Sequence, residues 1–511
     1  MRGRTRSVQF YLLAMVLGAV AGLLLILLLV QAKKDERRDQ DLAQRQQIRT
    51  RTEASLKKAD RMTKNGLYAE AQAAYETQLE KLSFESDAES FCLVTSRVAA
   101  THVELGRKGP GPGGFERAAE IAEDALDRCT ESVSQEAYAD LKNALGGAYA
   151  GLAQRRKPLY YLEEAVAAYR EALRFRTLES RPAEYGETRN NLGAALCEMA
   201  AYRDRDANLK EALSAFDEAL KVRLPERDPA GYATTQSNRG VAFYEQAQLG
   251  DTEANLNQAV EAHRQALSVR GLEDDPLGYA ASQNNLGMAY LALAAYRDSE
   301  ANLGKAVDAF EVALRVRTRE QHPQEYARTL NNLGVAYRDL AAFGENRPRL
   351  EKSVKAFQDA LQIRTMERDA VGFAATQNNL GAALRSLSVF GDRRGNLDRS
   401  LLALNEALRV RTPDRYPKDY AATQVNLGFS YRALADLGDR KNNLSRAVTA
   451  FEEALKIYSP ERYPDQNHQV SASLEKTREL LKKSSYYYAP KAPAAAPANS
   501  APATAKAPEA G

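Results

Sequence analysis

The residues with the most chemical capacity are arginines that recur at a fixed interval. Arg338, Arg385 and Arg432 are separated by steps of 47 residues, and Arg328 lies shortly before the first of them. A guanidinium group pairs with a carboxylate through two parallel hydrogen bonds. These four arginines therefore predict a surface that binds an acidic segment, although a solvated polar face explains them equally well.

Asparagine recurs at the same interval. One set is Asn191, Asn238, Asn285, Asn332, Asn379 and Asn426. A second set, one position earlier, is Asn143, Asn190, Asn284, Asn331 and Asn378. Asparagine is a mediocre helix former because its amide competes with the backbone. The amides could bind the backbone of an extended peptide or bond one repeat to the next, and the sequence leaves both interpretations open.

The other reactive residue types form no catalytic or metal-binding pattern. Four histidines and three cysteines lie at no metal-ligand spacing. Nucleophile-elbow and P-loop motifs are absent from the sequence. The net charge of +3 gives no sign of nucleic-acid binding. We therefore expect no enzyme activity, no catalytic residue, no metal and no cofactor.

One 47-residue period supplies the elements that must position the arginines and asparagines. In the last full period, residues 420–437 and 443–458 each carry apolar residues at helical spacing. Prolines such as Pro417 and Pro464 precede the first helix of a pair, and glycines such as Gly428 let neighbouring helices approach closely. The period extends over residues 53–482, which predicts an all-α, right-handed α-solenoid of about nine antiparallel helix pairs and a final capping helix.

Two further residue sets are assigned structural roles. Asparagines are expected to be N-caps of the second helices at Asn208, Asn255, Asn302, Asn396 and Asn443. Arginines end the second helices at Arg176, Arg223, Arg270, Arg317, Arg364 and Arg411. Each of these arginines has an acid three residues later, which favours a local ion pair. The acids are Glu179, Glu226, Glu273, Glu320, Glu367 and Asp414.

The pattern resembles the tetratricopeptide repeat (TPR). The residues that carry the resemblance are Leu427, Gly428 and Tyr431 on the first helix and Ala447, Phe451 and Ala454 on the second. The 47-residue length departs from the usual repeat of about 34 residues and is similar to long bacterial and kinesin-light-chain-like variants. The resemblance implies a superhelix whose first helices line a concave surface that binds peptides or protein segments.

The two ends of the chain differ from the repeats. Residues 1–9 form a short basic tail, residues 10–30 carry no charge and are long enough for a transmembrane helix, and residues 31–52 form a charged helical stalk. A cleaved signal peptide is the alternative for residues 10–30. Residues 483–511 are rich in proline and alanine and are expected to be disordered. The expected localisation is single-pass in a bacterial inner membrane. The count of Lys and Arg beside the span favours a cytoplasmic C-terminal domain, whereas a nine-residue tail with three arginines is hard to translocate and favours an extracytoplasmic one, the side that we prefer.

These expectations combine into one functional prediction. A membrane-anchored scaffold would bind protein or peptide partners along its concave surface through the asparagine and arginine sets. The alternative is a structural element that self-associates or spans the cell envelope. Cys92 and Cys129 are expected at adjoining helix ends, so a disulfide between them is conceivable in an oxidising compartment.

Overall fold

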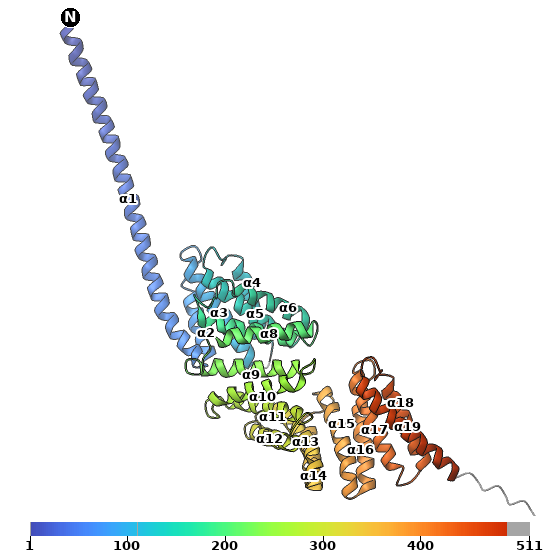
Figure 1. Cartoon of the computed structure of the whole chain (residues 1–511). Helices are drawn as coiled ribbons and strands as arrows, with labels where there is room; N and C mark the ends of the chain where they lie inside the picture. Colours follow the sequence, from blue (N-terminus) through green and yellow to red (C-terminus); the bar gives the residue numbers. More distant parts are fainter. Residues whose placement is uncertain (1, 110, 488–511) are drawn as a thin grey trace, which may run out of the picture. The chain divides into compact units, whose positions relative to one another are not determined.

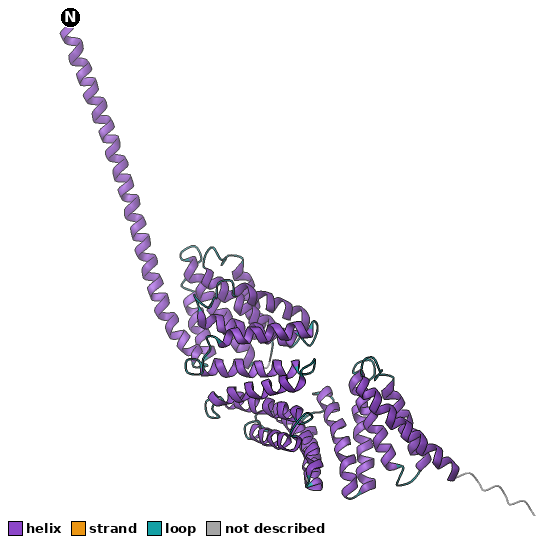
Figure 2. Ribbon diagram, in the orientation of Figure 1, coloured by secondary structure: helices purple, strands orange, loops and turns teal. Residues whose placement is uncertain are grey.

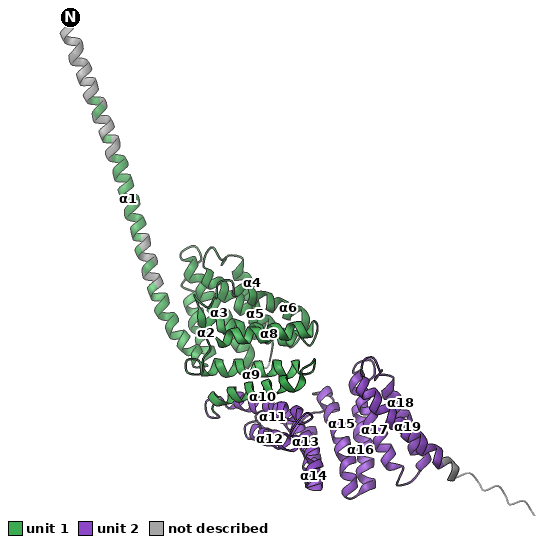
Figure 3. Cartoon of the chain, viewed as in Figure 1, with its two compact units in different colours: residues 1–271 green, residues 272–511 purple. Residues whose placement is uncertain are grey.

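Helices and their connecting loops make up the whole of the described chain. In the computed structural model, residues 2–109 and 111–487 are described, and this part contains no strand (Figure 2). The chain divides into two compact units, residues 1–271 and residues 272–511 (Figure 3). The prediction of an all-helical repeat fold is confirmed.

Unit 1 begins with a long helix and continues as helix pairs (Figure 1). Its helices are α1 (Arg2–Lys64), α2 (Tyr68–Leu79), α3 (Ala88–Lys108), α4 (Gly113–Leu126), α5 (Gln135–Ala153), α6 (Pro158–Ala172), α7 (Pro182–Met199), α8 (Arg205–Leu220), α9 (Pro229–Gln246) and α10 (Thr252–Val269). The C-terminal end of α1 packs its Leu56 and Ala59 against Ala71 and Tyr75 of α2 and Val94 of α3.

Unit 2 repeats the helix pair with little variation. Its helices are α11 (Pro276–Leu293), α12 (Ser299–Leu314), α13 (Pro323–Leu340), α14 (Asn346–Leu361), α15 (Ala370–Leu387), α16 (Arg393–Leu408), α17 (Pro417–Leu434), α18 (Arg440–Leu455) and α19 (Pro464–Tyr487). Short 3-10 helices, Ala341–Phe343 and Ser388–Phe390, extend α13 and α15. Residues 488–511, most of the predicted disordered tail, lie outside the described residues.

The structure does not support the membrane anchoring that was predicted from residues 10–30. These residues belong to α1, which continues without a break into the charged residues that follow Val30. Within the described residues, no helix combines the necessary length and apolar character. The predicted single-pass membrane localisation, and the membrane side assigned to the C-terminal domain, fail with it.

The core of each repeat is a large side chain placed over a glycine. Phe357 of α14 is fully buried, and a Cβ added at Gly334 of α13 would lie 2.7 Å from its ring. Gly287, Gly428 and Gly193 face Phe310, Phe451 and Phe216 in the same way. In the α9–α10 pair the ring is that of His263, whose pKa burial lowers to about 4, so it packs as a neutral aromatic. The predicted role of these glycines in close helix packing follows from this geometry.

Replacement of Gly334 by alanine is expected to destabilise unit 2 by about 1–3 kcal/mol, because Phe357 must leave its rotamer or the helices must separate. The matched control is Gly304→Ala in α12, where an added Cβ meets nothing within 4 Å. This control should be neutral or stabilising by up to about 1 kcal/mol, the helix-propensity gain of alanine. Urea unfolding of the two variants, followed by circular dichroism, measures the difference. Equal midpoints would contradict the packing role of Gly334.

The predicted asparagine N-caps are misplaced by four residues. The residue before α18 is Asp439, which adopts the left-handed conformation with φ +45°. Asn443 lies inside α18, and its Nδ2 donates 2.9 Å back to the carbonyl of Gly438. Asn208, Asn255, Asn302 and Asn396 make the same bond to the loop before their own helices. These asparagines therefore hold the tight loop closed from its C-terminal side.

A disulfide joins Cys92 of α3 to Cys129 in the loop after α4. Their Cα atoms lie 5.5 Å apart, and both side chains are buried. They belong to a core cluster that also contains Phe115 and Leu141. The disulfide that the sequence left as a possibility is therefore present in the structure. Cys197 is a free thiol.

Candidate functional site

The asparagine sets bond neighbouring repeats to each other. In unit 2, Asn379 Nδ2 donates to Asn331 Oδ1 over 3.1 Å, and Asn426 Nδ2 donates to Asn378 Oδ1 over 3.0 Å. Asn332 bonds to Asn284 in the same way, as does Asn238 to Asn190 in unit 1. The asparagines therefore do form a structural ladder that joins one repeat to the next.

The same asparagines keep some hydrogen-bonding capacity. An amide nitrogen has two hydrogens, and its oxygen has two lone pairs. Asn379 uses one hydrogen for Asn331, and its oxygen accepts 3.4 Å from Asn378 Nδ2. Asn379 is half-buried, as are Asn191, Asn238, Asn285, Asn332 and Asn426. A role in binding a peptide backbone stays a prediction.

Three of the four predicted arginines form one cluster in unit 2. Arg338, Arg385 and Arg432 lie on α13, α15 and α17, and all are half-buried. Burial lowers the pKa of Arg385, and repulsion from Arg338 and from Arg432 lowers it further. Arg338 Nε also lies 2.8 Å from Asp339 Oδ1. We call Arg338, Arg385 and Arg432 the arginine row.

An aromatic ring supports two members of the arginine row. The guanidinium groups of Arg432 and Arg385 lie 5.0 Å and 5.5 Å from the centre of the Phe429 ring. Cation–π contacts of this kind hold a guanidinium group in place without neutralising it. Arg385 Nε is buried and makes no hydrogen bond. The row is thus a fixed concentration of positive charge.

Sequence reasoning missed Phe429. The residue after the packing glycine is Ala194, Val241, Met288, Val335 or Ala382 in the other repeats. Only the last repeat carries an aromatic ring there. An aromatic residue at this otherwise non-aromatic position was the sequence signal that could have identified Phe429.

Arg328 belongs to a different charge cluster. It lies on α13, is exposed, and interacts electrostatically with Arg317 and Arg364. Both of those residues are among the arginines at the ends of second helices, and both are buried. The structure therefore separates Arg328 from the arginine row.

The arginines that end the second helices have other partners than the predicted ones. Arg364 Nη1 donates to Thr376 Oγ1 over 3.1 Å, and Arg411 Nη1 donates to Thr423 Oγ1 over 3.0 Å. Arg176, Arg223 and Arg317 bond to Thr188, Thr235 and Thr329 in the same manner. Each of these five guanidinium groups thus reaches the first helix of the next pair, whereas Arg270 bonds to Thr234 and Ser237 on the first helix of its own pair. For these five arginines the structural role is as expected, but the partner is not the acid three residues later.

Unit 1 contains a buried ion cluster centred on Asp140 of α5. Arg176 Nη2 lies 2.7 Å from Asp140 Oδ1, and Arg181 Nη1 lies 2.8 Å from the same oxygen. Arg97 Nη1 of α3 lies 3.5 Å from Asp140 Oδ2. The Asp140 side chain is only 4% exposed. The cluster joins three helix pairs and was not predicted.

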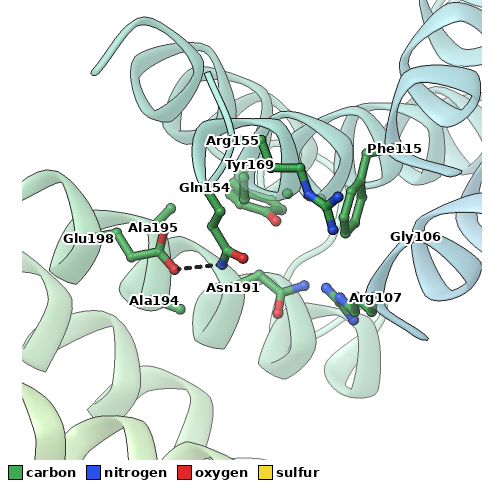
Figure 4. A pocket seen from close by; sticks show the side chains of 13 residues that line it. Gly106, Arg107, Phe115, Gln154, Arg155, Tyr169, Asn191, Ala194, Ala195 and Glu198 are labelled. Carbon is green, nitrogen blue, oxygen red and sulfur yellow. Dashed lines mark hydrogen bonds between the residues drawn. The ribbon is translucent and has the colours of Figure 1, made fainter. Parts of the chain in front are cut away.

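Unit 1 also contains a pocket of 280 Å³ (Figure 4). Figure 4 shows Gln154 and Glu198 on one side of the pocket, Arg107 and Arg155 on the other, and Asn191 between them. Gln154 Nε2 donates to Glu198 Oε1 over 3.4 Å. Burial raises the pKa of Glu198, although Gln154 opposes the shift. Of the predicted site residues, Asn191 is the one that lines this pocket.

Metal chemistry finds no support in the described part of the chain. No group of three or more histidine, cysteine, aspartate or glutamate residues is placed there to hold a metal ion. The arginines and asparagines of the candidate site can bind a partner by ion pairs and hydrogen bonds.

Neither a protein-family model nor a curated protein matches the chain. Solved structures of similar arrangement do exist. The apo form of RapI has a TM-score of 0.42 and 14% identity over 77% of this chain and 98% of its own. A Rap protein complexed with Competence and Sporulation Factor has a TM-score of 0.41 and 13% identity over 84% and 98%. The P58(IPK) TPR domain has a TM-score of 0.24 and 14% identity over 85% and 99%. None of these likenesses assigns a function to the chain.

Proposed function

We propose that the protein is a helical-repeat adaptor that binds an acidic segment of a protein partner through unit 2. The observation that carries the proposal is the arginine row, in which Arg338, Arg385 and Arg432 lie near enough to repel one another. A bound carboxylate would relieve this repulsion and would pair with a guanidinium group already held by Phe429. Stacked helix pairs provide a preformed surface, so little ordering entropy opposes binding.

The half-buried asparagines of unit 2 are proposed to assist. Their unused amide hydrogens and oxygen lone pairs suit the backbone of an extended peptide. In this arrangement the arginine row selects acidic side chains, and Asn332, Asn379 and Asn426 fix the direction of the peptide. No covalent step is involved.

The triple variant Arg338→Glu, Arg385→Glu and Arg432→Glu tests the proposal. The probe is a fluorescent capped peptide of alternating glutamate and glycine, with its glutamine counterpart as the neutral reference. Wild type should prefer the acidic peptide, and the triple variant should bind it at least about 100-fold more weakly, because hydrogen bonds to charged groups contribute about 1.5–3 kcal/mol each. Fluorescence anisotropy at fixed ionic strength measures both affinities.

A charge-matched control separates the arginine row from net charge. Arg393, Arg394 and Arg440 on α16 and α18 are exposed, with 47%, 61% and 40% of their side-chain surface accessible. Their conversion to glutamate changes the net charge equally and should leave binding almost unchanged. Equal losses in the two triple variants, or no preference for the acidic peptide, would refute the proposal. Size exclusion would separate it from the alternative of a self-associating element.

A further inference from the structure

The pocket of unit 1 lies where two positions of α5 carry small residues. Ala150 occupies the position that holds an arginine of the arginine row in three later repeats, and Gly147 occupies the position of Phe429. Both line the pocket. The long side chains that cover this part of the first helices in unit 2 are therefore missing here, and a cavity of 280 Å³ takes their place.

A buried hydroxyl group without a partner faces this cavity. Tyr169 of α6 lines the pocket and is only 1% exposed (Figure 4). Among the described residues, its Oη has no hydrogen-bond partner, whereas the Oη of buried Tyr75 donates to Asp60 over 2.6 Å. A Cβ added at Gly147 would lie 3.8 Å from Tyr169 Oη, so the glycine leaves the hydroxyl uncovered on that side. A buried hydroxyl group is costly unless it is bonded, which favours a partner from outside the chain.

Asn191 supplies a second uncommitted group. Its Oδ1 accepts 3.3 Å from Asn190 Nδ2, but its own Nδ2 makes no hydrogen bond within residues 2–109 and 111–487. Four equivalent asparagines do donate to the preceding repeat, namely Asn238, Asn332, Asn379 and Asn426. Asn191 lies between the two sides of the pocket (Figure 4), so its amide hydrogens are available to a ligand there.

The two sides of the pocket carry opposite charge. Arg107 and Arg155 lie on one side (Figure 4). Arg107 Nη1 lies 2.5 Å from Glu104 Oε1, and because a guanidinium group has several N–H donors it can bind a second carboxylate. On the other side, Glu198 Oε1 accepts only a long hydrogen bond, 3.4 Å from Gln154 Nε2. In the part of the chain that the structure describes, no basic group lies within 4.0 Å of Glu198, so this carboxylate has no counterion.

We propose that this pocket binds a short ligand that carries a carboxylate at one end and an ammonium group at the other. The carboxylate pairs with Arg107 and Arg155, and the ammonium group pairs with Glu198. Tyr169 Oη and Asn191 Nδ2 bond to the polar atoms of the ligand. The volume of 280 Å³ is just below the range of about 300–1,000 Å³ for small-molecule sites, which suits a ligand of the size of one amino acid.

Free lysine and the C-terminal lysine of a peptide share this chemistry. The site lies in unit 1, separate from the arginine row, and it does not depend on the proposed function.

Nα-acetyl-lysine is the probe, because it has one carboxylate and one ammonium group. Equilibrium dialysis of the isotopically labelled probe against the full chain, at fixed ionic strength, measures its affinity. Two analogues should bind at least about 10-fold more weakly, because each loses a charge-assisted hydrogen bond. They are Nα-acetyl-lysine amide, which lacks the carboxylate, and Nα-acetyl-norleucine, which lacks the ammonium group. Absence of saturable binding, or equal affinity for the three compounds, would overturn the proposal.

Two variants change the pocket with residues that the repeat already accepts. Ala194→Met fills the pocket with the side chain that Met288 has at the equivalent position, so it should fold and lose saturable binding. Tyr169→Phe removes only the hydroxyl group, since the equivalent ring is phenylalanine in Phe216 and Phe310. It should bind the probe roughly 2- to 10-fold more weakly, the effect of one neutral hydrogen bond. Circular dichroism checks that both variants are folded.

A third variant removes the negative charge of the pocket. Glu198→Gln should bind Nα-acetyl-lysine at least about 10-fold more weakly, because the ammonium group loses its counterion. The matched control is Glu211→Gln on α8, an exposed change of the same charge outside the pocket, which should bind like wild type. Wild-type affinity in Ala194→Met, or equal affinities of Glu198→Gln and Glu211→Gln, would overturn the site.

The source of the ligand is a separate arm of the experiment. A peptide that ends in lysine is compared with free lysine. Tighter binding of the peptide supports the site with a chain end as its ligand, and tighter binding of free lysine supports it with a free amino acid. The triple variant of the arginine row should keep its affinity for Nα-acetyl-lysine, so the two proposals can fail independently. Loss of binding in that variant would place the probe in unit 2 and would overturn the site in unit 1.

Discussion

Replacement of Asp140 by asparagine should lower the free energy of unfolding of unit 1 by about 3–5 kcal/mol, the cost of removing one partner from a buried ion pair. Asp140 receives hydrogen bonds from Arg176 and Arg181 and faces Arg97, while its own side chain is 4% exposed. Asparagine keeps the size but not the charge, so the buried guanidinium groups lose their counterion. Hydrogen exchange of the α5–α7 amides measures the loss locally.

The control is Asp206→Asn at the start of α8. Asp206 is 55% exposed, pairs with Lys210 on the same helix and accepts a hydrogen bond from Gln246 of α9. An asparagine oxygen can still accept that bond, so the replacement should change stability by less than about 0.5 kcal/mol. The same exchange experiment applies to both variants. A loss below about 1 kcal/mol for Asp140→Asn would show that the cluster does not hold the helix pairs together.

The stability contributed by Asp140 should depend on pH in a defined direction. Burial alone would raise the pKa of Asp140, but Arg176, Arg97 and Arg181 outweigh it and hold the pKa below its ordinary value. A carboxyl group whose pKa is lower in the folded state stabilises the fold above its unfolded pKa, about 3.9, and loses that contribution as the pH falls through the folded pKa. The difference between wild type and Asp140→Asn should therefore stay constant near neutral pH and shrink in acid below about pH 4.

Local signals in the sequence predicted the helices but not the contacts between helix pairs. Apolar periodicity and the prolines place the first helices correctly, and α7 and α17 begin at Pro182 and Pro417. The period also put Gly334 in register with the other packing glycines, although it could not name Phe357 as the ring above it. The first success depends on residues a few positions apart along one helix, and the second depends on the 47-residue period.

The partners of the charged residues could not be predicted from local spacing. Arg176 has Glu179 three residues later, which suits a local pair, yet its partners are Asp140 and Thr188. Partners so far apart in sequence are decided by how successive helix pairs stack, which the local spacing of one helix does not contain. For the asparagines the signal was present but ambiguous, because Asn426 and Asn378 differ by one repeat plus one residue. That offset brings the two amides together only once the stacking is known.

The candidate site was predicted only in part for the same reason. The 47-residue spacing found Arg338, Arg385 and Arg432, which lie close enough together to repel. Arg328 was added to them without that spacing, and in the structure it interacts electrostatically with Arg317 and Arg364 instead.

Reduction of the disulfide between Cys92 and Cys129 should cost unit 1 roughly 3–4 kcal/mol, as expected for a cross-link that closes a loop of this length in the unfolded chain. The two cysteines are separated by 37 residues in sequence. Both are buried, so the native protein should resist reductant until unit 1 opens. Hydrogen exchange with and without reductant should show the loss in unit 1, with unit 2 unchanged. The fully denatured, unreduced protein should show one reactive thiol, that of Cys197. Three reactive thiols in the denatured, unreduced protein would contradict the disulfide.

The disulfide and the Asp140 cluster should not act independently. Cys92 and Arg97 lie on the same helix, α3, which the disulfide ties to the end of α4 and which Asp140 ties to α5. Once α3 is released from one partner, its contact with the other is less well fixed, so neighbouring changes of this kind are not additive. The combined loss in reduced Asp140→Asn should differ from the sum of the two separate losses by about 0.5 kcal/mol or more. A strictly additive result, measured by the same exchange experiment, would mean that α3 is held by each contact separately.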